Sequence, residues 1–467
     1  MTALPHGWAR VRLEEIAEVR LGRQRSPKNH SGSQMRPYLR AANVGWNGLR
    51  LDDVKQMNFT DAEAEIHRLA VDDIVVVEAS GSPDEVGKPA IWRDEVTDCC
   101  LQNTLIRVRS AGVDPRYLLH FLDGVARSGG FVTRSRGVGI NHLGSSRLAA
   151  WQVPVAPLDE QRRIVSILEE NLSRVDAGTD LLRRIRSRSS QIEEGLLRAL
   201  LVGPGDNGCA DGPKSNNIDD GYLPPIPKSW RWMRLAEIAE VVGGVTKDSS
   251  RQSDPSVPLV PYLRVANVQR GWLDLTEVSE IRLPESRAKK LELQYGDVLL
   301  NEGGDRDKLG RGWIWEEQVG GCIHQNHVFR ARIRHGRLNP KLLAWHANSF
   351  GRPWFERNGR QTTNLASISL SKIKQFPVPV PPVDEQTALV ERIEDQLIAN
   401  RRTADAARHA LVKASHLRRS LLAEAFAGRF ATQDPDDEPA SVLLSRIKGQ
   451  REKPRPTGRS RGATARE

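Results

Sequence analysis

Residues 153–161 read VPVAPLDEQ, and residues 378–386 read VPVPPVDEQ, an offset of 225 positions. The prolines cannot continue a helix, and the acidic pair that follows them favours a helix N-terminus. Each copy therefore marks a boundary at which a domain ends and a helix begins. Because the boundary occurs twice, the sequence predicts two copies of one unit.

Matches on either side of this boundary support the same interpretation. Residues 8–19 (WARVRLEEIAEV) return as residues 230–241 (WRWMRLAEIAEV), and residues 38–44 (YLRAANV) return as residues 262–268 (YLRVANV). The matches keep one order at a nearly constant offset along the whole chain. Such a period is far longer than the roughly 20–50 residues of a solenoid repeat. The chain is therefore predicted to be a tandem duplication of one domain-sized unit.

Within each copy the character of the sequence changes once. The first part mixes short β-rich runs with turns, such as residues 71–77 (VDDIVVV) and 101–108, with counterparts at 297–300 and 323–333. A long helical pattern follows each boundary, and Gly203 and Gly428 end the two patterns at equivalent places. At about 42 residues, each helix would be ~60 Å long.

Apolar residues recur along both helical patterns at spacings of three, four or seven. The positions expected to pack are Leu168, Val175, Leu182, Ile185, Ile192 and Leu196 in the first helix, and Ile393, Leu397, Leu411 and Leu421 in the second. Such heptad-like spacing predicts that the helices pack on each other as a coiled coil. The alternative is that each helix lies on its own domain.

The predicted fold class is α+β, with two tandem repeats that each consist of a β-rich α/β domain and one long helix. The expected segments are a first domain at 1–155, a long helix at 156–203, a linker at 204–227, a second domain at 228–380, a second long helix at 381–430, and a disordered charged tail at 431–467.

Charge and cysteine usage indicate the partner class and the compartment. The chain carries 69 Lys and Arg against 59 Asp and Glu, a formal charge of +10, which favours a polyanionic partner. Its first residues lack the apolar core of a signal peptide, and no apolar run reaches the ~20 residues of a membrane span. Four cysteines without paired spacing indicate reduced thiols. A cytoplasmic protein without membrane contact is expected.

Candidate catalytic motifs fail on spacing. Residues 81–88 (GSPDEVGK) resemble a phosphate-binding loop, but their glycines are six apart instead of five, and Pro89 occupies the position of the magnesium-binding hydroxyl. Cys322, His324 and His327 correspond to Cys99, Leu101 and Thr104 in the first copy, so the fold does not need a metal there and no metal site is expected. No methylation motif and no Ser/His/Asp grouping occurs. The sequence therefore predicts no catalytic residue.

Segments just before each boundary combine arginine, glycine and amides, at residues 133–142 and 357–364. Arginine commonly reads guanine and Asn or Gln reads adenine, while small hydroxyl side chains mainly hold phosphates. A solvated surface loop is the alternative. The candidate DNA-binding residues are Arg134, Arg136 and Asn141 in the first copy, Arg357, Arg360, Gln361, Thr362 and Asn364 in the second, and Lys88 and Arg311 in the glycine loops, which are otherwise plain turns.

A β-rich domain with Y-L-R-x-A-N-V, then a V-P-V-P-P-x-D-E-Q boundary and a long helix, all repeated once, resembles the specificity subunit of type I restriction–modification systems. The resemblance covers residues from about 6 to 428. It implies two target recognition domains that read the halves of a split, asymmetric DNA site. It further implies antiparallel helices, related by a pseudo-twofold axis, that act as a spacer. One departure is the stretch EASG at residues 78–81, where the family commonly has a basic residue.

The resemblance also implies the partners and cofactors of the system. The chain would bind double-stranded DNA, two methyltransferase subunits and restriction/translocase subunits. S-adenosylmethionine, ATP and magnesium would be bound by those partners, with no cofactor on this chain. The open alternatives are the reading subunit of a methylation-only system, a two-domain protein-binding scaffold, and a fused methyltransferase or nuclease fragment, against which the missing motifs argue.

Overall fold

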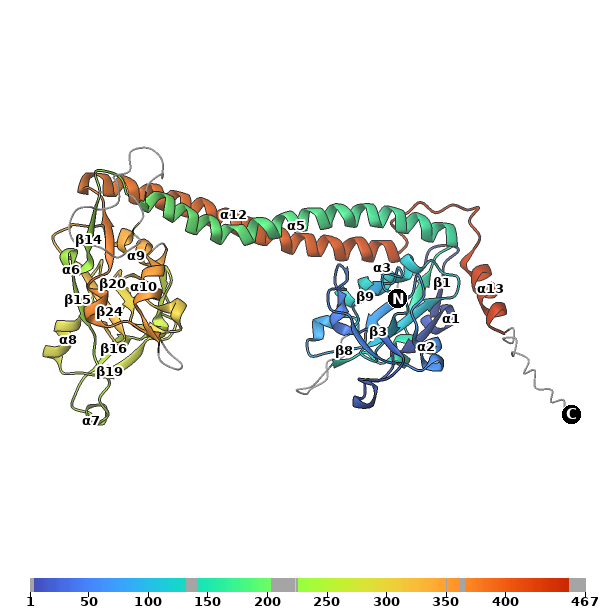
Figure 1. Cartoon of the computed structure of the whole chain (residues 1–467). Coiled ribbons are helices and arrows are strands. Elements are labelled where there is room, and N and C mark those ends of the chain that lie inside the picture. Colours follow the sequence, from blue (N-terminus) through green and yellow to red (C-terminus); the bar gives the residue numbers. More distant parts are fainter. Residues whose placement is uncertain are drawn as a thin grey trace. The chain divides into compact units, whose positions relative to one another are not determined.

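The computed structural model describes residues 4–131, 141–202, 223, 226–349, 351–361 and 366–452. The chain forms two compact units, of which unit 1 comprises residues 1–182 and 409–467 and unit 2 comprises residues 183–408. Each unit therefore holds one β-rich domain and a part of each long helix (Figure 1).

Unit 1 is built on a four-stranded antiparallel sheet of order β2-β11-β7-β9. Its central strand β7 (Ile74–Val77) is buried along its whole length, as an uninterrupted run of β-branched residues predicts. The flanking strands are β2 (Ala17–Leu21), β11 (Leu105–Ser110) and β9 (Pro89–Ile91). A second sheet consists of β10 (Cys100–Leu101), β3 (Met35–Leu39) and β6 (Lys55–Asn58), and β1 (Ala9–Arg12) pairs with β13 (Gln152–Val155).

Short elements complete this domain. They are α1 (Leu13–Ile16), α2 (Asp61–His67), α3 (Pro115–Arg127), α4 (Ser145–Ala149), η1 (Pro27–Asn29), η2 (Ala41–Asn43), η3 (Pro83–Glu85), and the short strands β4 (Val44–Gly45), β5 (Gly48–Leu49), β8 (Ala79–Ser80) and β12 (Asn141–His142).

Unit 2 repeats this arrangement with the equivalent strand order β15-β24-β20-β22. These strands are β15 (Ala239–Gly243), β24 (Val328–Ile333), β20 (Val298–Asn301) and β22 (Gly312–Ile314). The remaining strands are β14 (Arg231–Arg234), β16 (Leu259–Leu263), β17 (Val268–Gln269), β18 (Trp272–Leu273), β19 (Ser279–Arg282), β21 (Gly303–Gly304), β23 (Ile323–His324), β25 (Arg360–Gln361), β26 (Ala366–Ser367) and β27 (Pro377–Val380). Its helices are α6 (Leu235–Ile238), α7 (Ser249–Gln252), α8 (Glu285–Leu291), α9 (Pro340–Asn348), α10 (Arg352–Asn358), α11 (Leu370–Ile373), η4 (Val265–Asn267) and η5 (Arg306–Lys308).

The long helices are α5 (Leu158–Val202), with 45 residues, and α12 (Val383–Phe426), with 44 residues. The repeated DEQ motif fastens the start of each helix to its domain. In unit 1, Trp8 Nε1 donates to Glu160 at 3.0 Å and the Asp114 amide donates to Gln161 Oε1 at 2.9 Å. The equivalent residues of unit 2 form the same contacts at 2.9 and 2.7 Å. The motif is therefore a helix–domain joint.

The helix ends, more than their middles, supply buried apolar side chains. The start of α5 (Ile164, Val165, Leu168, Leu172) and the end of α12 (Leu422, Ala425) belong to the core of unit 1. The end of α5 (Leu197, Leu200, Leu201) and the start of α12 (Val390, Ile393, Leu397) belong to the core of unit 2.

The expected packing positions follow this division. Leu168, Ile393 and Leu397 are buried as expected, whereas Ile192 is 53% exposed, which corrects its assignment to the packed stripe. Leu197, and not Ile192, turns inward, because this end of α5 packs against the β-rich domain of unit 2. The other predicted positions are half-buried, namely Val175, Leu182, Ile185, Leu196, Leu411 and Leu421.

The charged tail differs from its prediction. Residues 440–452 form α13 (Ala440–Glu452), which packs on unit 1 through Ala440, Leu443 and Ile447. These three apolar residues share one helical face, a pattern that the low overall hydrophobicity of the segment obscures. Residues 453–467 lie outside the described part of the chain. None of the described helices has the length and apolar character to span a bilayer.

Candidate functional site

The segment before each boundary pairs with the glycine-containing loop of the same unit. In unit 2, Ser367 of β26 lies opposite Arg360 of β25 and opposite Gly303 of β21, so these strands form one three-stranded sheet. In unit 1, Asn141 of β12 lies opposite Ser80 of β8. The two kinds of loop that the sequence offered as separate candidates are therefore neighbours on one surface in each unit.

Backbone hydrogen bonds hold this junction in the same way in both units. The Leu143 amide donates to the Glu78 carbonyl at 2.7 Å, and the Ile368 amide donates to the Glu302 carbonyl at 2.9 Å. Because these two glutamates directly follow the buried central strands β7 and β20, the rigid sheet fixes the position of the loops. Rigid support of this kind favours a binding role for the loops.

A polar cleft of 840 Å³ lies at this junction in unit 2. Arg357, Arg360 and Lys372 supply three cations against the single carboxylate of Glu302. Arg357 and Arg360 are exposed, and within the described residues neither forms an ion pair. The remaining lining residues are Asn358, Gly359, Ser367, Ser369 and Ser371. Unpaired guanidinium groups beside hydroxyl groups can bind phosphate oxygens and the edges of bases.

Three residues of this cleft went unnoticed in the sequence. Ser369, Ser371 and Lys372 belong to the run SISLSK at residues 367–372, at the start of α11. This run follows the predicted loop by only a few residues, and its polar residues alternate with apolar ones. Because apolar residues alternate with the polar ones, the run did not look like part of a binding surface.

A carboxylate–imidazole pair lies beside the junction in each unit. His327 Nδ1 is 2.6 Å from Glu302, and His142 Nδ1 is 3.1 Å from Glu78. The glutamates are equivalent in the two repeats, but the histidines come from different segments. The equivalent glutamates therefore contact histidines at non-equivalent positions, so the side chains around the two junctions differ.

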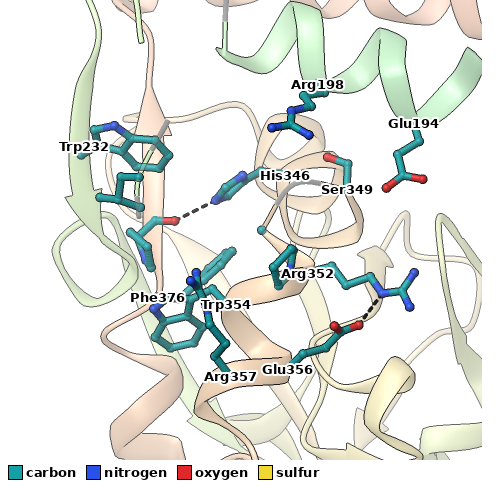
Figure 2. A pocket seen from close by; sticks show the side chains of 14 residues that line it. Glu194, Arg198, Trp232, His346, Ser349, Arg352, Trp354, Glu356, Arg357 and Phe376 are labelled. Atoms are coloured by element: carbon teal, nitrogen blue, oxygen red, sulfur yellow. Dashed lines mark hydrogen bonds and ion pairs between the residues drawn. The ribbon is translucent and has the colours of Figure 1, made fainter. Parts of the chain in front are cut away.

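A second cleft of 510 Å³ adjoins the first and shares Arg357 with it (Figure 2). Its walls place the rings of Trp232, Trp354 and Phe376 around His346, beside charged side chains that include Arg198 and Arg352. His346 Nε2 lies 2.7 Å from the Pro377 carbonyl, to which it donates, and its ring stacks on Phe376. Burial lowers the pKa of His346 to about 4, which keeps the ring neutral at pH 7.

The glycine-loop cations are less accessible than expected. Lys88 is 2% exposed, pairs with Glu85 and lies 5.9 Å from the Trp46 ring centroid, so its ammonium does not reach the surface. Lys88 is thus corrected from a phosphate contact to a buried group within its loop. Arg311 is half-buried, and burial lowers its pKa.

Some predicted site residues cannot be placed. Arg134, Arg136, Thr362 and Asn364 lie outside the described residues. Asn141 and Gln361 are placed only as backbone, in β12 and β25.

Cys322, His324 and His327 have separate surroundings. His324 Nδ1 lies 2.6 Å from the Val328 carbonyl, and burial lowers its pKa to about 4, while His327 pairs with Glu302. Burial raises the pKa of Cys322 to about 12. Among the described residues, no group of three or more potential ligands could hold a metal ion.

Comparison with known proteins gives one consistent family. Residues 5–187 match the type I restriction modification DNA specificity domain. The chain is 24% identical to the StySPI specificity subunit of Salmonella potsdam and 25% identical to the EcoKI specificity subunit of Escherichia coli K12. Each comparison covers 96% of both chains.

Solved structures share the fold. A chain from a type I R-M system, solved to describe complex assembly and conformational transition, has a TM-score of 0.68 at 17% identity and covers 92% of this chain and 100% of its own length. The HsdS subunit of Thermoanaerobacter tengcongensis has a TM-score of 0.54 at 18% identity over 92% and 98%. The repeated boundary motif, the matched domain and the relatives aligned over 96% of their length together make this chain similar to the specificity subunits of type I restriction–modification systems.

Proposed function

We propose that this chain is the sequence-reading subunit of a type I restriction–modification complex and that each unit reads one half of a bipartite, asymmetric DNA site. The observation that carries the proposal is the basic cleft of unit 2, where two exposed arginines without ion pairs among the described residues lie beside three serines. Guanidinium groups pair bidentately with guanine, and hydroxyl groups hold phosphates. The equivalent β8–β12 junction of unit 1 supports a second reading surface.

Different side chains at the two junctions support an asymmetric site. Equivalent glutamates meet histidines from different segments, and the loops before the boundaries differ in sequence. Two unlike readers on one chain would recognise a site that is not a palindrome. Joining them on one chain also raises avidity through effective concentration.

In this proposal α5 and α12 form an antiparallel coiled coil that spaces the two readers. The helices would also position two methyltransferase subunits and, with them, restriction/translocase subunits. The chain itself would be non-catalytic, and the partners would bind S-adenosylmethionine, ATP and magnesium. The full-length similarity to specificity subunits supports these assignments.

The salt dependence of duplex binding tests the cleft. Cations that touch phosphates release counterions, and each contact contributes about 0.9 to the slope of log K against log salt. Replacing Arg357 and Arg360 with Ala should therefore lower that slope by roughly 1 to 2 for the full chain on a random-sequence duplex. Lys289→Ala with Lys290→Ala removes the same charge from α8, which contributes nothing to the cleft, and serves as the control.

The comparison of the two variants decides the matter. A reduced slope for the cleft variant alone supports DNA contact at this surface. Equal slopes for the two variants would leave only general charge attraction, and the proposed reading surface would be wrong.

A further inference from the structure

We infer that polar residues on α5 and α12 select pairing between the first-repeat helix and the second-repeat helix, and oppose the pairing of either helix with a copy of itself. The inference concerns the helices and goes beyond the proposed DNA-reading function. The partner that α5 selects is α12, with the residues of the second repeat at the matching register.

Among the described residues, one ion pair in each unit joins the two helices as follows. In unit 1, Asp176 of α5 pairs with Arg418 of α12, whose side chain is only 13% exposed. In unit 2, Glu193 of α5 lies 3.6 Å from Arg401 of α12. Both acids come from α5, and both arginines come from α12.

The repeat makes these two contacts equivalent. The helices align without a gap at an offset of 225, from the DEQ motif at their start to Gly203 and Gly428 after their ends. Asp176 therefore corresponds to Arg401, and Glu193 corresponds to Arg418. The Asp176–Arg418 and Glu193–Arg401 contacts therefore occupy equivalent positions, with the two helices interchanged. The charges are not interchanged. The first-repeat helix is acidic at both positions, and the second-repeat helix is basic at both.

This division of charge opposes self-pairing. Two copies of α5 in the same antiparallel arrangement would bring Asp176 of each against Glu193 of the other. Two copies of α12 would bring Arg401 against Arg418. Like charges at contacting helix positions destabilise about as much as opposite charges stabilise, and natural coiled coils use such charges to choose partners.

A hydrogen-bonded polar pair adds an independent preference. Asn400 Nδ2 donates to the Ser189 carbonyl at 2.9 Å, and Ser189 Oγ lies 3.2 Å from Asn400 Oδ1. The equivalent positions hold Val175 and Ala414. In a self-paired arrangement Asn400 would face Ala414, which has no hydroxyl group, and would lose the hydrogen bond that the Ser189 hydroxyl donates. A half-buried asparagine between helices is a known means of fixing register.

The apolar residues at the ends of α5 and α12 provide no such selection. Leu197, Leu200 and Leu201 at the end of α5 correspond to Leu422, Ala425 and Phe426 at the end of α12, and all six are apolar. Either set can pack against the apolar surface of a β-rich domain. The polar positions therefore carry the preference between the helices.

A cut full-length chain tests the inference. A protease site inserted between residues 203 and 222 of the intact protein would be cleaved after folding, and the two fragments would exchange at equilibrium. Native mass spectrometry then counts mixed and self-paired complexes. In the wild-type protein, mixed complexes should exceed the statistical share because like-charge contacts disfavour self-pairs by roughly tenfold.

The decisive variant exchanges the ion pair of unit 2, Glu193→Arg with Arg401→Glu, because Arg418 of the other pair also lies 3.9 Å from Asp123 of α3. Both cross-helix pairs of the folded chain remain complementary, but every self-paired arrangement becomes complementary too. Self-paired complexes should rise about fivefold or more. The matched control, Glu170→Arg with Arg174→Glu, exchanges an exposed pair within α5 and should leave the proportions unchanged.

Two results would overturn the inference. One is a wild-type protein that already self-pairs at the statistical share, and the other is an unchanged proportion in the exchanged variant. The uncut chain gives a further measurement, since Glu193→Arg alone should lower the melting temperature and added Arg401→Glu should restore it. Failure of the second change to restore stability would also contradict the role of this ion pair.

Discussion

Arg360 and Ser367 face each other across the β25–β26 pair, and Gly303 lies on the opposite side of Ser367. This register brings the loop before the boundary and the glycine-containing loop into one small sheet. Each loop alone resembles ordinary surface, but together they line a basic cleft. The arrangement depends on β26, a strand of two residues that lies just before the short helix α11 in the chain.

The glycine loops depend on backbone conformation in a testable way. Gly87 has φ +83°, and a Cβ atom there would lie 2.2 Å from the buried Phe131 ring, so Gly87→Ala should lower the free energy of unfolding by ~1–3 kcal/mol. Gly81 in the same loop has open space around it, and Gly81→Ala should change stability by less than about 0.5 kcal/mol. Urea denaturation followed by circular dichroism compares them. Equal effects would show that the Gly87 packing does not constrain the loop.

The C-terminal helix should stabilise unit 1 through one face. Ile447 is 2% exposed and lies against Gly112, so Ile447→Ala should cost about 2–4 kcal/mol of unfolding free energy. Val442 on the same helix is 41% exposed, and Val442→Ala should cost less than about 0.5 kcal/mol. Chemical denaturation measures both variants. If Ile447→Ala proved as mild as its control, α13 would not be part of the unit 1 core.

Acid should weaken unit 2 because two of its histidines are buried and neutral. The pKa values of His324 and His346 are lowered from 6.5 to about 4 by burial, so between these pH values the unfolded chain binds more protons than the folded chain. Stability is therefore full above pH 6.5 and falls as the pH is lowered toward 4, by up to about 3 kcal/mol for each histidine.

His346→Gln tests this pH dependence. The variant keeps a side-chain donor for the Pro377 carbonyl but no longer titrates, so its unfolding free energy should depend less steeply on pH in this window. Melting temperatures between pH 4 and 7 provide the measurement. A slope equal to that of the wild type would mean that His346 is not the responsible group.

Much of the fold could be predicted from periodicity and duplication. The strand β7 and the two long helices lie close to their predicted places, because long apolar periodic runs have few alternative conformations. The helix α13 could not be predicted from its composition, since the three buried residues that hold it have meaning only against the surface of unit 1. Ile192 was misplaced because packing on a domain overrides the heptad pattern at that end of α5.

The candidate site could be predicted only in outline. Arginine and amide content indicated the loop that carries Arg357 and Arg360, but the cleft also needs Ser369 and Lys372, which the fold adds. Lys88 looked like a free cation in the sequence, whereas the structure buries it beside Glu85. Side-chain burial in a loop depends on distant residues, in this case Trp46, and local sequence carries little information about it.

The measurement that tests the central claim most directly is a binding selection on randomised duplexes with the assembled complex. Arg360→Ala should relax base preference in one half-site by about 10- to 100-fold and leave the other half unchanged, since one bidentate contact contributes ~1–3 kcal/mol of discrimination. Asn141→Ala at the β8–β12 junction should relax the opposite half. Unchanged preferences in both halves, or equal loss in both halves from one substitution, would contradict the account of two separate readers on one chain.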